Sequence, residues 1–198
     1  MFKRSPALTA RFDHAFLYAH RLHNRQVRKG STIPYLSHLL GVASLVLEDG
    51  GDEDEAIAAL LHDAVEDQGG LATLEDIRQL FGARVADLVL SLSDSTGKPR
   101  PPWRERKEKY LHHLRLAEQS VLRVSLADKL QNARLIAVDL RRSGKRTWDR
   151  FNGGKDGTLW YYHALVETFH ECYRSPFVIE LELTVNEIEQ LQGEIEAA

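Results

Sequence analysis

A histidine and an aspartate, His62 and Asp63, stand side by side in the chain and could both bind a metal ion. An acidic pair, Glu66 and Asp67, follows one helical turn later. Residues four apart lie on one face of a helix, so we expect each member of the first pair to lie beside one of the second. The apolar run 56–61 would draw this helix into a core, where ionised carboxylates are costly unless they are paired or bind a metal. The pattern therefore predicts a buried cation site.

Two other segments carry matching side chains: His38 in the stretch PYLSH, and Asp128 in the stretch LADKLQN. Two imidazoles and two carboxylates form a nitrogen and oxygen donor set, unlike the thiolates of a structural zinc site. Four protein ligands leave positions on an octahedral ion open for water and a phosphate oxygen. The residues alone allow Fe²⁺ or another divalent ion. A satisfied core pair or a helix cap would explain His62 and Asp63, but not the other two residues as well.

The order of these four residues resembles the HD superfamily of metal-dependent phosphohydrolases, in which the matching positions bind the metal. The four are His38, His62, Asp63 and Asp128. The longer pattern, in which PYxxH precedes HDxxED and LADKLxN follows, is similar to the hydrolase domain of the RelA/SpoT family. That domain removes pyrophosphate from the 3′ position of the alarmone ppGpp. The resemblance covers about residues 21–160, and it implies hydrolysis of (p)ppGpp to GDP or GTP plus pyrophosphate with Mn²⁺ as cofactor.

The acidic pair is associated with hydrolysis in the resembled family, and many other HD enzymes lack it. We expect Glu66 to act as the general base on a bound water, with a pKa set by the cation and by partial burial. Asp67 would orient or share that proton. The alternative is that two acids simply end a helix before Gly69. Acids are unfavourable near a helix C-terminus, which favours a functional interpretation.

Substrate-binding positions are implied by the same resemblance. In the family, a basic segment before the first histidine contacts the nucleotide and its phosphates, an asparagine contacts the sugar or base, and a later stretch lines the 5′-phosphate side in small hydrolases. The matching residues are Arg28, Lys29, Ser31, Asn132, Lys155 and Tyr161. Arginine can bind phosphate through two hydrogen bonds, whereas lysine acts as a point charge. Leu135 stands where many long family members carry threonine, a departure that affects base recognition.

Helical periodicity dominates the chain, and no sustained alternation typical of strands is present. We therefore expect an all-α fold: a single HD domain over residues 1–198 with roughly eight to ten helices. The first helix should end at Gly30 and the second should start near Leu36. A capping box of Asp52 and Glu55 should open the ligand-bearing helix, which should continue to Gly69. Further helices are expected at 73–81 (capped by Thr73), 85–92, 103–116, 120–142 and 176–195, with loops at 93–102 and 144–157.

The composition suits one globular domain in a reducing compartment. The 198 residues are 43% hydrophobic, which is enough for a sizeable core. The sequence shows no apolar run of the roughly 18 residues that a membrane span needs, and no signal-peptide pattern. A single cysteine, Cys172, excludes an internal disulfide framework. We expect a cytoplasmic, free-standing small alarmone hydrolase without the synthetase and regulatory domains of long RelA/SpoT proteins.

The net charge of −3 makes nucleic acid an unsuitable partner and leaves a small-molecule nucleotide as the expected one. A phosphate-bearing substrate then requires a local basic lining that overcomes the overall field. Candidates are Arg21, Arg25, Arg28, Lys29, Lys98, Arg100, Arg104, Arg106, Arg146, Arg150 and Lys155, each of which could also be a solvated surface charge. A homo-oligomer is compatible with the sequence.

Two alternatives to an alarmone hydrolase stay open at this point. One is an HD phosphohydrolase acting on another nucleotide, such as a 3′-phosphorylated cofactor or a nucleoside monophosphate. The other is a non-catalytic HD module that senses a nucleotide. A sensor would be marked by a lost ligand or a lost acidic pair, and this chain has lost neither.

Overall fold

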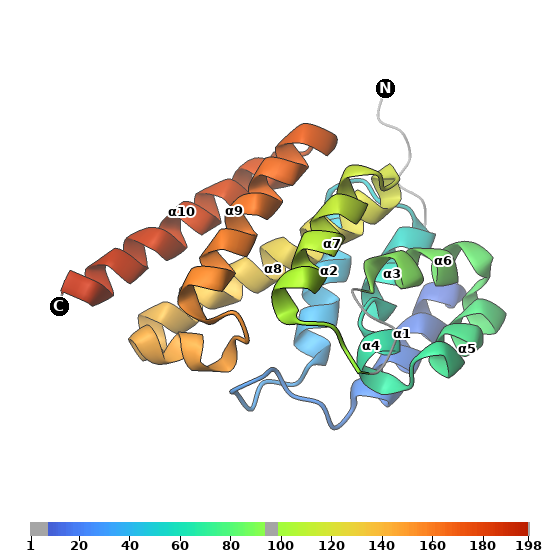
Figure 1. Cartoon of the computed structure of the whole chain (residues 1–198). Coiled ribbons are helices and arrows are strands. Elements are labelled where there is room, and N and C mark those ends of the chain that lie inside the picture. The colour runs from blue at the N-terminus through green and yellow to red at the C-terminus, as the bar shows by residue number, and fades with distance from the viewer. Residues whose placement is uncertain (1–7, 94–98, 198) are drawn as a thin grey trace.

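The computed structural model describes residues 8–93 and 99–197, and within these ranges every regular element is a helix (Figure 1). In chain order the elements are α1 (Ala10–His23), α2 (Leu36–Glu48), α3 (Glu53–Leu61), α4 (Ala64–Gln68), α5 (Leu71–Phe81), α6 (Ala83–Leu92), α7 (Trp103–Arg115), α8 (Gln119–Ser143), the 3-10 helix η1 (Gly144–Arg150), α9 (Gly154–Cys172) and α10 (Pro176–Ala197). The expected all-α fold is confirmed. In the expected loop 93–102, residues 94–98, with the candidate Lys98, lie outside the described residues. No described helix is long and apolar enough to cross a membrane.

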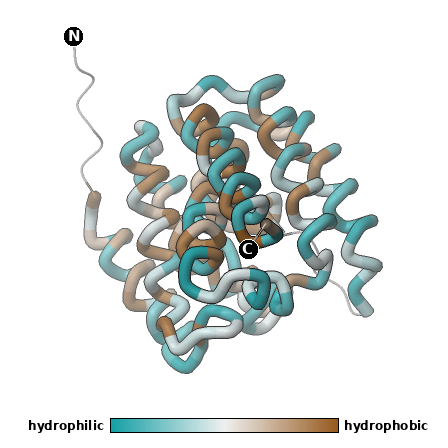
Figure 2. Tube along the Cα trace, turned by 90° about the vertical axis from the view of Figure 1, so that its left-hand side faces the viewer, coloured by the Kyte–Doolittle hydropathy of each residue, from teal (hydrophilic) through white to brown (hydrophobic). Residues whose placement is uncertain are grey.

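The longest described helix, α8, packs against α2, α3, α6, α9 and α10. Figure 1 shows α9 and α10 on one side of the molecule and α1 with α3–α6 on the other, with α2 and α7 between them. Hydrophobic and hydrophilic residues alternate along most helices (Figure 2), and the buried apolar side chains form one core cluster, so burial of apolar surface holds the helices around α8. Asp128 sits midway along this helix, among buried neighbours.

The first helix is shorter than the sequence indicated. Thr9 caps α1, because its hydroxyl accepts a backbone N–H at 3.2 Å, and the helix ends at His23 instead of Gly30. After His23 the chain forms an isolated antiparallel bridge between Val27 and Pro34. Gly30 lies in the turn of this bridge with a φ of 75°, a conformation that glycine adopts without steric cost. The bridge returns the chain to the start of α2.

The expected ligand-bearing helix is split in two at the ligand pair. Its capping box is confirmed, because the Glu55 N–H donates to Asp52 at 3.0 Å and the Asp52 N–H donates to Glu55 at 2.7 Å. However, α3 ends at Leu61, and Asp63 adopts φ −94° and ψ −2° before α4 begins. The prediction of one continuous helix was wrong for a geometric reason. Adjacent helical residues point in different directions, so the break allows His62 and Asp63 to reach the same site.

The start of α5 also differs from the expectation. Gly70, with a φ of 66°, precedes the helix, which begins at Leu71. Thr73 is therefore inside the first turn and is not its cap. Its buried hydroxyl instead donates to the Gln68 carbonyl at 3.2 Å and ties α5 to the end of α4. The expected stop at Gly82 is confirmed.

The expected loop 144–157 is largely helical, since it contains η1 and the first turn of α9. The anchor is Trp148, which is buried and donates its indole N–H to Gln192 of α10 at 2.6 Å. This long-range contact holds η1 against α10, and no local sequence pattern predicts it. The expected opening of α10 after Ser175 is confirmed by the Ser175 hydroxyl, which accepts a backbone N–H at 3.1 Å.

Candidate functional site

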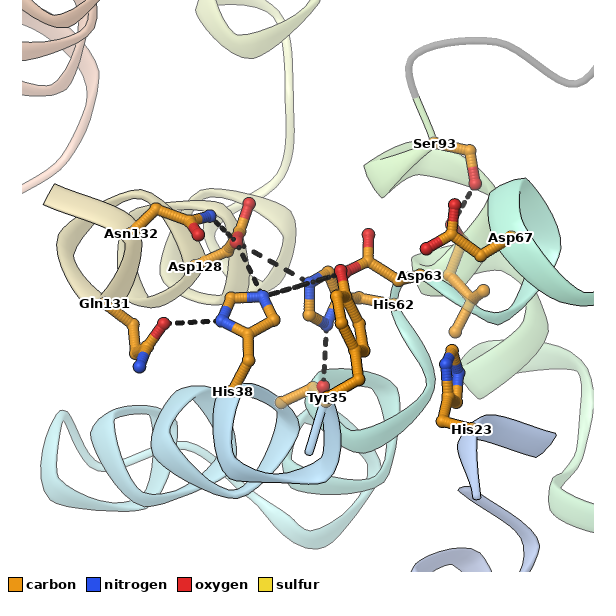
Figure 3. A network of polar contacts seen from close by, with 12 residues as sticks. His23, Tyr35, His38, His62, Asp63, Asp67, Ser93, Asp128, Gln131 and Asn132 are labelled. Atoms are coloured by element: carbon orange, nitrogen blue, oxygen red, sulfur yellow. Dashed lines mark hydrogen bonds and ion pairs between the residues drawn. The ribbon is translucent and has the colours of Figure 1, made fainter. Parts of the chain in front are cut away.

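Four side chains converge where α2, the α3–α4 break and α8 meet (Figure 3). They are His38, His62, Asp63 and Asp128. Ligand atoms of His38, His62 and Asp128 all lie within 4.8 Å of one another. Asp63 adjoins this set, with its Oδ2 3.0 Å from His62 Nε2 and 3.6 Å from His38 Nε2. The structure thus brings all four predicted ligands together, and their binding of a metal stays a prediction.

Both imidazoles are oriented through the nitrogen that faces away from the cluster. His38 Nδ1 donates to Gln131 Oε1 at 2.5 Å, and His62 Nδ1 donates to the Ala59 carbonyl at 2.8 Å. Each Nε2 therefore presents a lone pair, and the two Nε2 atoms lie 3.3 Å apart. Lone pairs and carboxylate oxygens at such distances repel one another unless a positive charge lies among them. The donor set fits a divalent cation.

Negative charge on Asp63 and Asp128 attracts positive charge to the cluster. Burial favours neutral His62, but Asp63 and Asp128 outweigh it and raise the pKa of His62 well above its usual value. Burial likewise favours neutral Asp128, but Lys129 and the two imidazoles hold the pKa of Asp128 well below its usual value. Lys129 Nζ donates to Asp128 Oδ2 at 2.5 Å, and Asn132 Nδ2 donates to Oδ1 at 2.6 Å. Both oxygens of this carboxylate are therefore fixed in place.

Tyr35 and Arg28 connect the bridge segment to the cluster. The Tyr35 hydroxyl donates to Asp63 Oδ2 at 2.5 Å, and burial, reinforced by Asp63, raises the pKa of Tyr35 far above its usual value. The hydroxyl consequently keeps its proton. Arg28 lies over the Tyr35 ring, 5.4 Å from its centroid, and donates to Asn132 Oδ1 at 2.5 Å. The basic segment is thereby held against the LADKLQN segment of α8, next to Asp128.

A hollow with two adjoining parts lies beside the ligand cluster. One part, of about 180 Å³, is lined by His62, Asp63 and Asp128. A larger part, of about 490 Å³, extends away from the cluster past Lys29 and Arg150. The two parts share the lining residues Arg28, Tyr35, Lys107, Lys129 and Asn132. Positive side chains gather here although the whole chain is acidic, which favours an anionic ligand.

The acidic pair borders this hollow. Glu66 lines the smaller part and Asp67 the larger part. They lie in the short helix α4, which has five residues and ends at Gln68 before Gly69, so both are close to its C-terminus as expected. Arg100 Nη2 lies 3.6 Å from Glu66 Oε2, and it also donates to the Glu66 carbonyl at 3.0 Å. Desolvation, reinforced by Asp63, raises the pKa of Asp67, which suits a carboxylate that accepts a proton.

Four of the six predicted substrate residues line the hollow: Arg28, Lys29, Asn132 and Tyr161. The other two, Ser31 and Lys155, do not line the hollow in the described structure. Ser31 donates its hydroxyl to the Arg28 carbonyl at 3.0 Å and accepts a backbone N–H at 3.2 Å, so it stabilises the turn. Lys155 does not line the hollow and instead contacts Glu196 of α10 at 2.7 Å. It precedes Tyr161 by six residues on α9, a spacing that places the two on different faces.

Sequence reasoning missed two lysines among the lining residues, Lys107 and Lys129. Lys129 directly follows Asp128 in the LADKLQN motif, and this adjacency could have identified it. Lys107 lies on α7, in a segment with many charged residues that no local pattern separates. Its place in the hollow follows from the packing of α7 against α9.

Trp103, at the start of α7, forms part of the wall of the larger hollow. Its indole lies against Gly153 and Gly157 at the start of α9. A Cβ atom added at Gly153 would come within 2.7 Å of the indole, and one at Gly157 within 3.2 Å. Only glycine fits Gly153 without a shift of the ring.

The HD domain family model matches residues 15–159, and the chain belongs to this family. Among curated relatives, the guanosine-3′,5′-bis(diphosphate) 3′-pyrophosphohydrolase MESH1 of Xenopus tropicalis is 38% identical over 134 residues, which is 66% of this chain and 70% of the relative. The bifunctional (p)ppGpp synthase/hydrolase SpoT of Escherichia coli K12 is 33% identical over 132 residues, which is 64% of this chain and 18% of SpoT.

A solved structure confirms the fold assignment. A metazoan ortholog of SpoT, described as hydrolysing ppGpp, superposes with a TM-score of 0.71 at 27% identity. The superposition covers 94% of this chain and 98% of that one. A Listeria monocytogenes protein superposes with a TM-score of 0.68 at 33% identity and covers 77% of this chain. The helical arrangement around the cluster is therefore that of HD-domain hydrolases.

Proposed function

We propose that this protein is a metal-dependent hydrolase that removes the 3′-pyrophosphate of guanosine alarmones. Water and ppGpp would give GDP and pyrophosphate, and pppGpp would give GTP and pyrophosphate. The proposal is supported by the names of the curated relatives and by the structural neighbour that hydrolyses ppGpp. It would place the protein in the stringent response, and its single cysteine suits the cytoplasm.

The observation that carries the proposal is the acidic pair at the edge of the ligand cluster. Glu66 and Asp67 border a hollow whose larger part, about 490 Å³, has the volume of a small-molecule site. Lysines and arginines line that space, as an anionic nucleotide requires. A nucleotide sensor would need the binding groups alone, whereas this site also keeps carboxylates suited to proton transfer.

His38, His62, Asp63 and Asp128 would hold the metal ion, which we propose to be Mn²⁺. When bound, such an ion would lower the pKa of a coordinated water molecule and polarise the P–O bond. The chain's own contribution is to fix the ligands: Gln131 and Ala59 orient the imidazoles, and Tyr35 orients Asp63. These contacts leave the Nε2 atoms directed at one point.

The reaction would proceed by attack of water on the phosphorus joined to O3′. A new O–P bond forms, the P–O3′ bond breaks, and O3′ takes up a proton. Glu66 would remove the proton from the water, and Asp67 would share it. Arg28 and Lys29 would bind phosphate or base, and Asn132 would orient the sugar beside Asp128. Lys129 would offset the negative charge that develops next to Asp128.

Product analysis tests the proposal. Purified protein would be incubated with ppGpp and Mn²⁺, and nucleotides and pyrophosphate would be separated by anion exchange. Stoichiometric GDP and pyrophosphate are expected, and a parallel panel of 3′-phosphorylated nucleotides and nucleoside monophosphates measures selectivity. Faster turnover of another nucleotide would replace the alarmone as substrate. Tight ppGpp binding without pyrophosphate release would show a sensor.

A further inference from the structure

Asp67 has a dedicated hydrogen-bond donor outside the ligand cluster. Gln26 lies between α1 and α2, and its Nε2 donates to Asp67 Oδ2 at 2.8 Å. An amide N–H stabilises the carboxylate in one orientation. Gln26 also lines the larger hollow beside Asp67, so its side chain stands at the edge of the reaction space.

The orientation of Gln26 is itself fixed by two donors. His23 Nδ1 donates to Gln26 Oε1 at 2.6 Å, and Gln68 Nε2 donates to the same oxygen at 2.5 Å. Because an amide oxygen only accepts hydrogen bonds, these contacts leave the amide N–H₂ directed at Asp67. Burial lowers the pKa of His23, so its neutral form is the donor.

His23 in turn shares a support with the ligand cluster. It is buried, and its ring stacks on Tyr35 with centroids 5.3 Å apart and an interplanar angle of 17°. Tyr35 donates to Asp63 on its other side. Figure 3 shows Tyr35 beside Asp63, with His23 below Asp67. One stacked pair of rings therefore holds both a ligand carboxylate and, through Gln26, the proton-transfer carboxylate.

We propose that Gln26 is a positioning residue that sets the orientation of the Asp67 carboxylate, with His23 and Gln68 holding its amide. The proposal rests on the proposed function, because it assigns Asp67 to proton transfer. Gln26 acts through Asp67 and takes no part in the chemistry itself. Its loss should therefore lower the rate of the chemical step more than it weakens substrate binding.

A double-mutant cycle in the full-length, Mn²⁺-loaded protein tests this. Gln26→Met keeps the size of the side chain and removes the amide. We expect kcat to fall roughly 10- to 100-fold, the scale of a misplaced catalytic group, with KM changed less than about threefold. In an Asp67→Asn background the same substitution should change kcat by less than about twofold, since the group it orients is already lost. Gln79→Ala is the matched control, because Gln79 donates to Glu75 on the surface.

Three results would overturn the inference in a wild-type protein that cleaves ppGpp. They are unchanged kcat in Gln26→Met, an equal loss in the Asp67→Asn background, and a change confined to KM. If Gln26→Met does not fold by circular dichroism, His23→Phe replaces it, because it keeps the stacking on Tyr35 and removes the donor to Gln26. The same cycle is expected, with a smaller fall in kcat. A wild-type protein without pyrophosphate release refutes the proposed function instead, which separates the two failures.

Discussion

The ligand cluster and the outer face of α10 both join charged groups across helices, but in opposite ways. Around the cluster, buried and half-buried side chains approach within 3.0 to 3.6 Å, and each has a second partner. Along α10, glutamates pair with α8 and α9 in a regular ladder that solvent reaches. Its pairs are Arg134–Glu180, Arg141–Glu187, His163–Glu189, His170–Glu182 and Lys155–Glu196.

The two regions differ in how far solvent reaches their charged groups. The charges of the cluster hold side chains in fixed positions, whereas those along α10 only join helices. Exposed pairs such as those of α10 contribute about 0–1 kcal/mol each, because water and salt screen them. Buried groups such as His38 and Asp128 cannot exchange their partners for water, so the loss of one partner leaves the others uncompensated. We therefore expect substitutions in the cluster to affect activity strongly and those in the ladder to affect stability weakly.

Metal removal should have the largest effect. Exhaustive chelation, or Asp128→Asn, should reduce activity to background, because both would remove the proposed metal ion from the cluster. An ion present at about 100 times its Kd stabilises the fold by about 2.7 kcal/mol, so chelation should lower Tm by roughly 5–10 °C. Metal content by mass spectrometry and calorimetry measure both effects. Full activity after chelation, or stoichiometric metal in Asp128→Asn, would contradict the ligand assignment.

Glu66→Gln should have the next largest effect. The variant keeps the shape of the side chain and removes its basic carboxylate, so kcat should fall about 10²- to 10⁴-fold. Metal content and ppGpp affinity should stay within a few-fold, which calorimetric titration measures. Glu75→Gln, on an exposed position of α5, is the control. Loss of metal in Glu66→Gln would make Glu66 a ligand, and wild-type kcat would remove it from the mechanism.

Lys29→Ala should mainly weaken substrate binding. Lys29 is exposed and lines the larger hollow, so the proposed phosphate contact would be worth about 1 kcal/mol, and KM should rise roughly fivefold. The salt dependence of KM should become shallower. Lys109→Ala is matched, since Lys109 is exposed on α7 and does not line the hollow. An unaltered KM and salt dependence would assign Lys29 to the solvated surface.

Glu187→Gln should have the smallest effect. It removes one exposed pair of the α10 ladder, so unfolding free energy should fall by less than about 1 kcal/mol, with kcat unchanged. Urea unfolding at low salt and at 1 M salt measures it, and the difference from wild type should vanish at high salt. A loss above roughly 3 kcal/mol would show that the ladder behaves like a buried network, and the contrast between the two regions would fail.

The sequence predicted the parts of this molecule that local chemistry dictates. The capping box of Asp52 and Glu55 and the start of α10 after Ser175 depend on neighbours within three residues, and both form as expected. The convergence of His38 and Asp128 was predictable because both residue types can bind a metal and the order of the motifs resembles a family that uses them together. The resemblance to the RelA/SpoT hydrolase domain led us to expect Arg28 and Asn132 at the substrate site, and both line the hollow.

The parts that were missed depend on how distant elements pack. In a continuous helix, His62 and Asp63 would point in different directions, and the break between α3 and α4 lets both reach the same site. Helical periodicity alone cannot predict such a break. Lys107 and Gln26 reach the hollow because α7 and the bridge segment fold over it. Lys155 lies away from the lining of the hollow, and the direction of its side chain could not be predicted because the start of α9 was expected to be a loop.

Trp103 lines the larger hollow and packs against Gly153 and Gly157, so the residues at these two positions determine where this wall lies. Gly153 and Gly157 allow the indole to pack closely because they have no Cβ atom, and the ring lies against the positions where a Cβ would be. The width of the larger hollow thus depends on Gly153 and Gly157, which contact Trp103 but do not line the hollow themselves. A change of one residue there would move an aromatic surface and leave every ligand and every proton-transfer group in place.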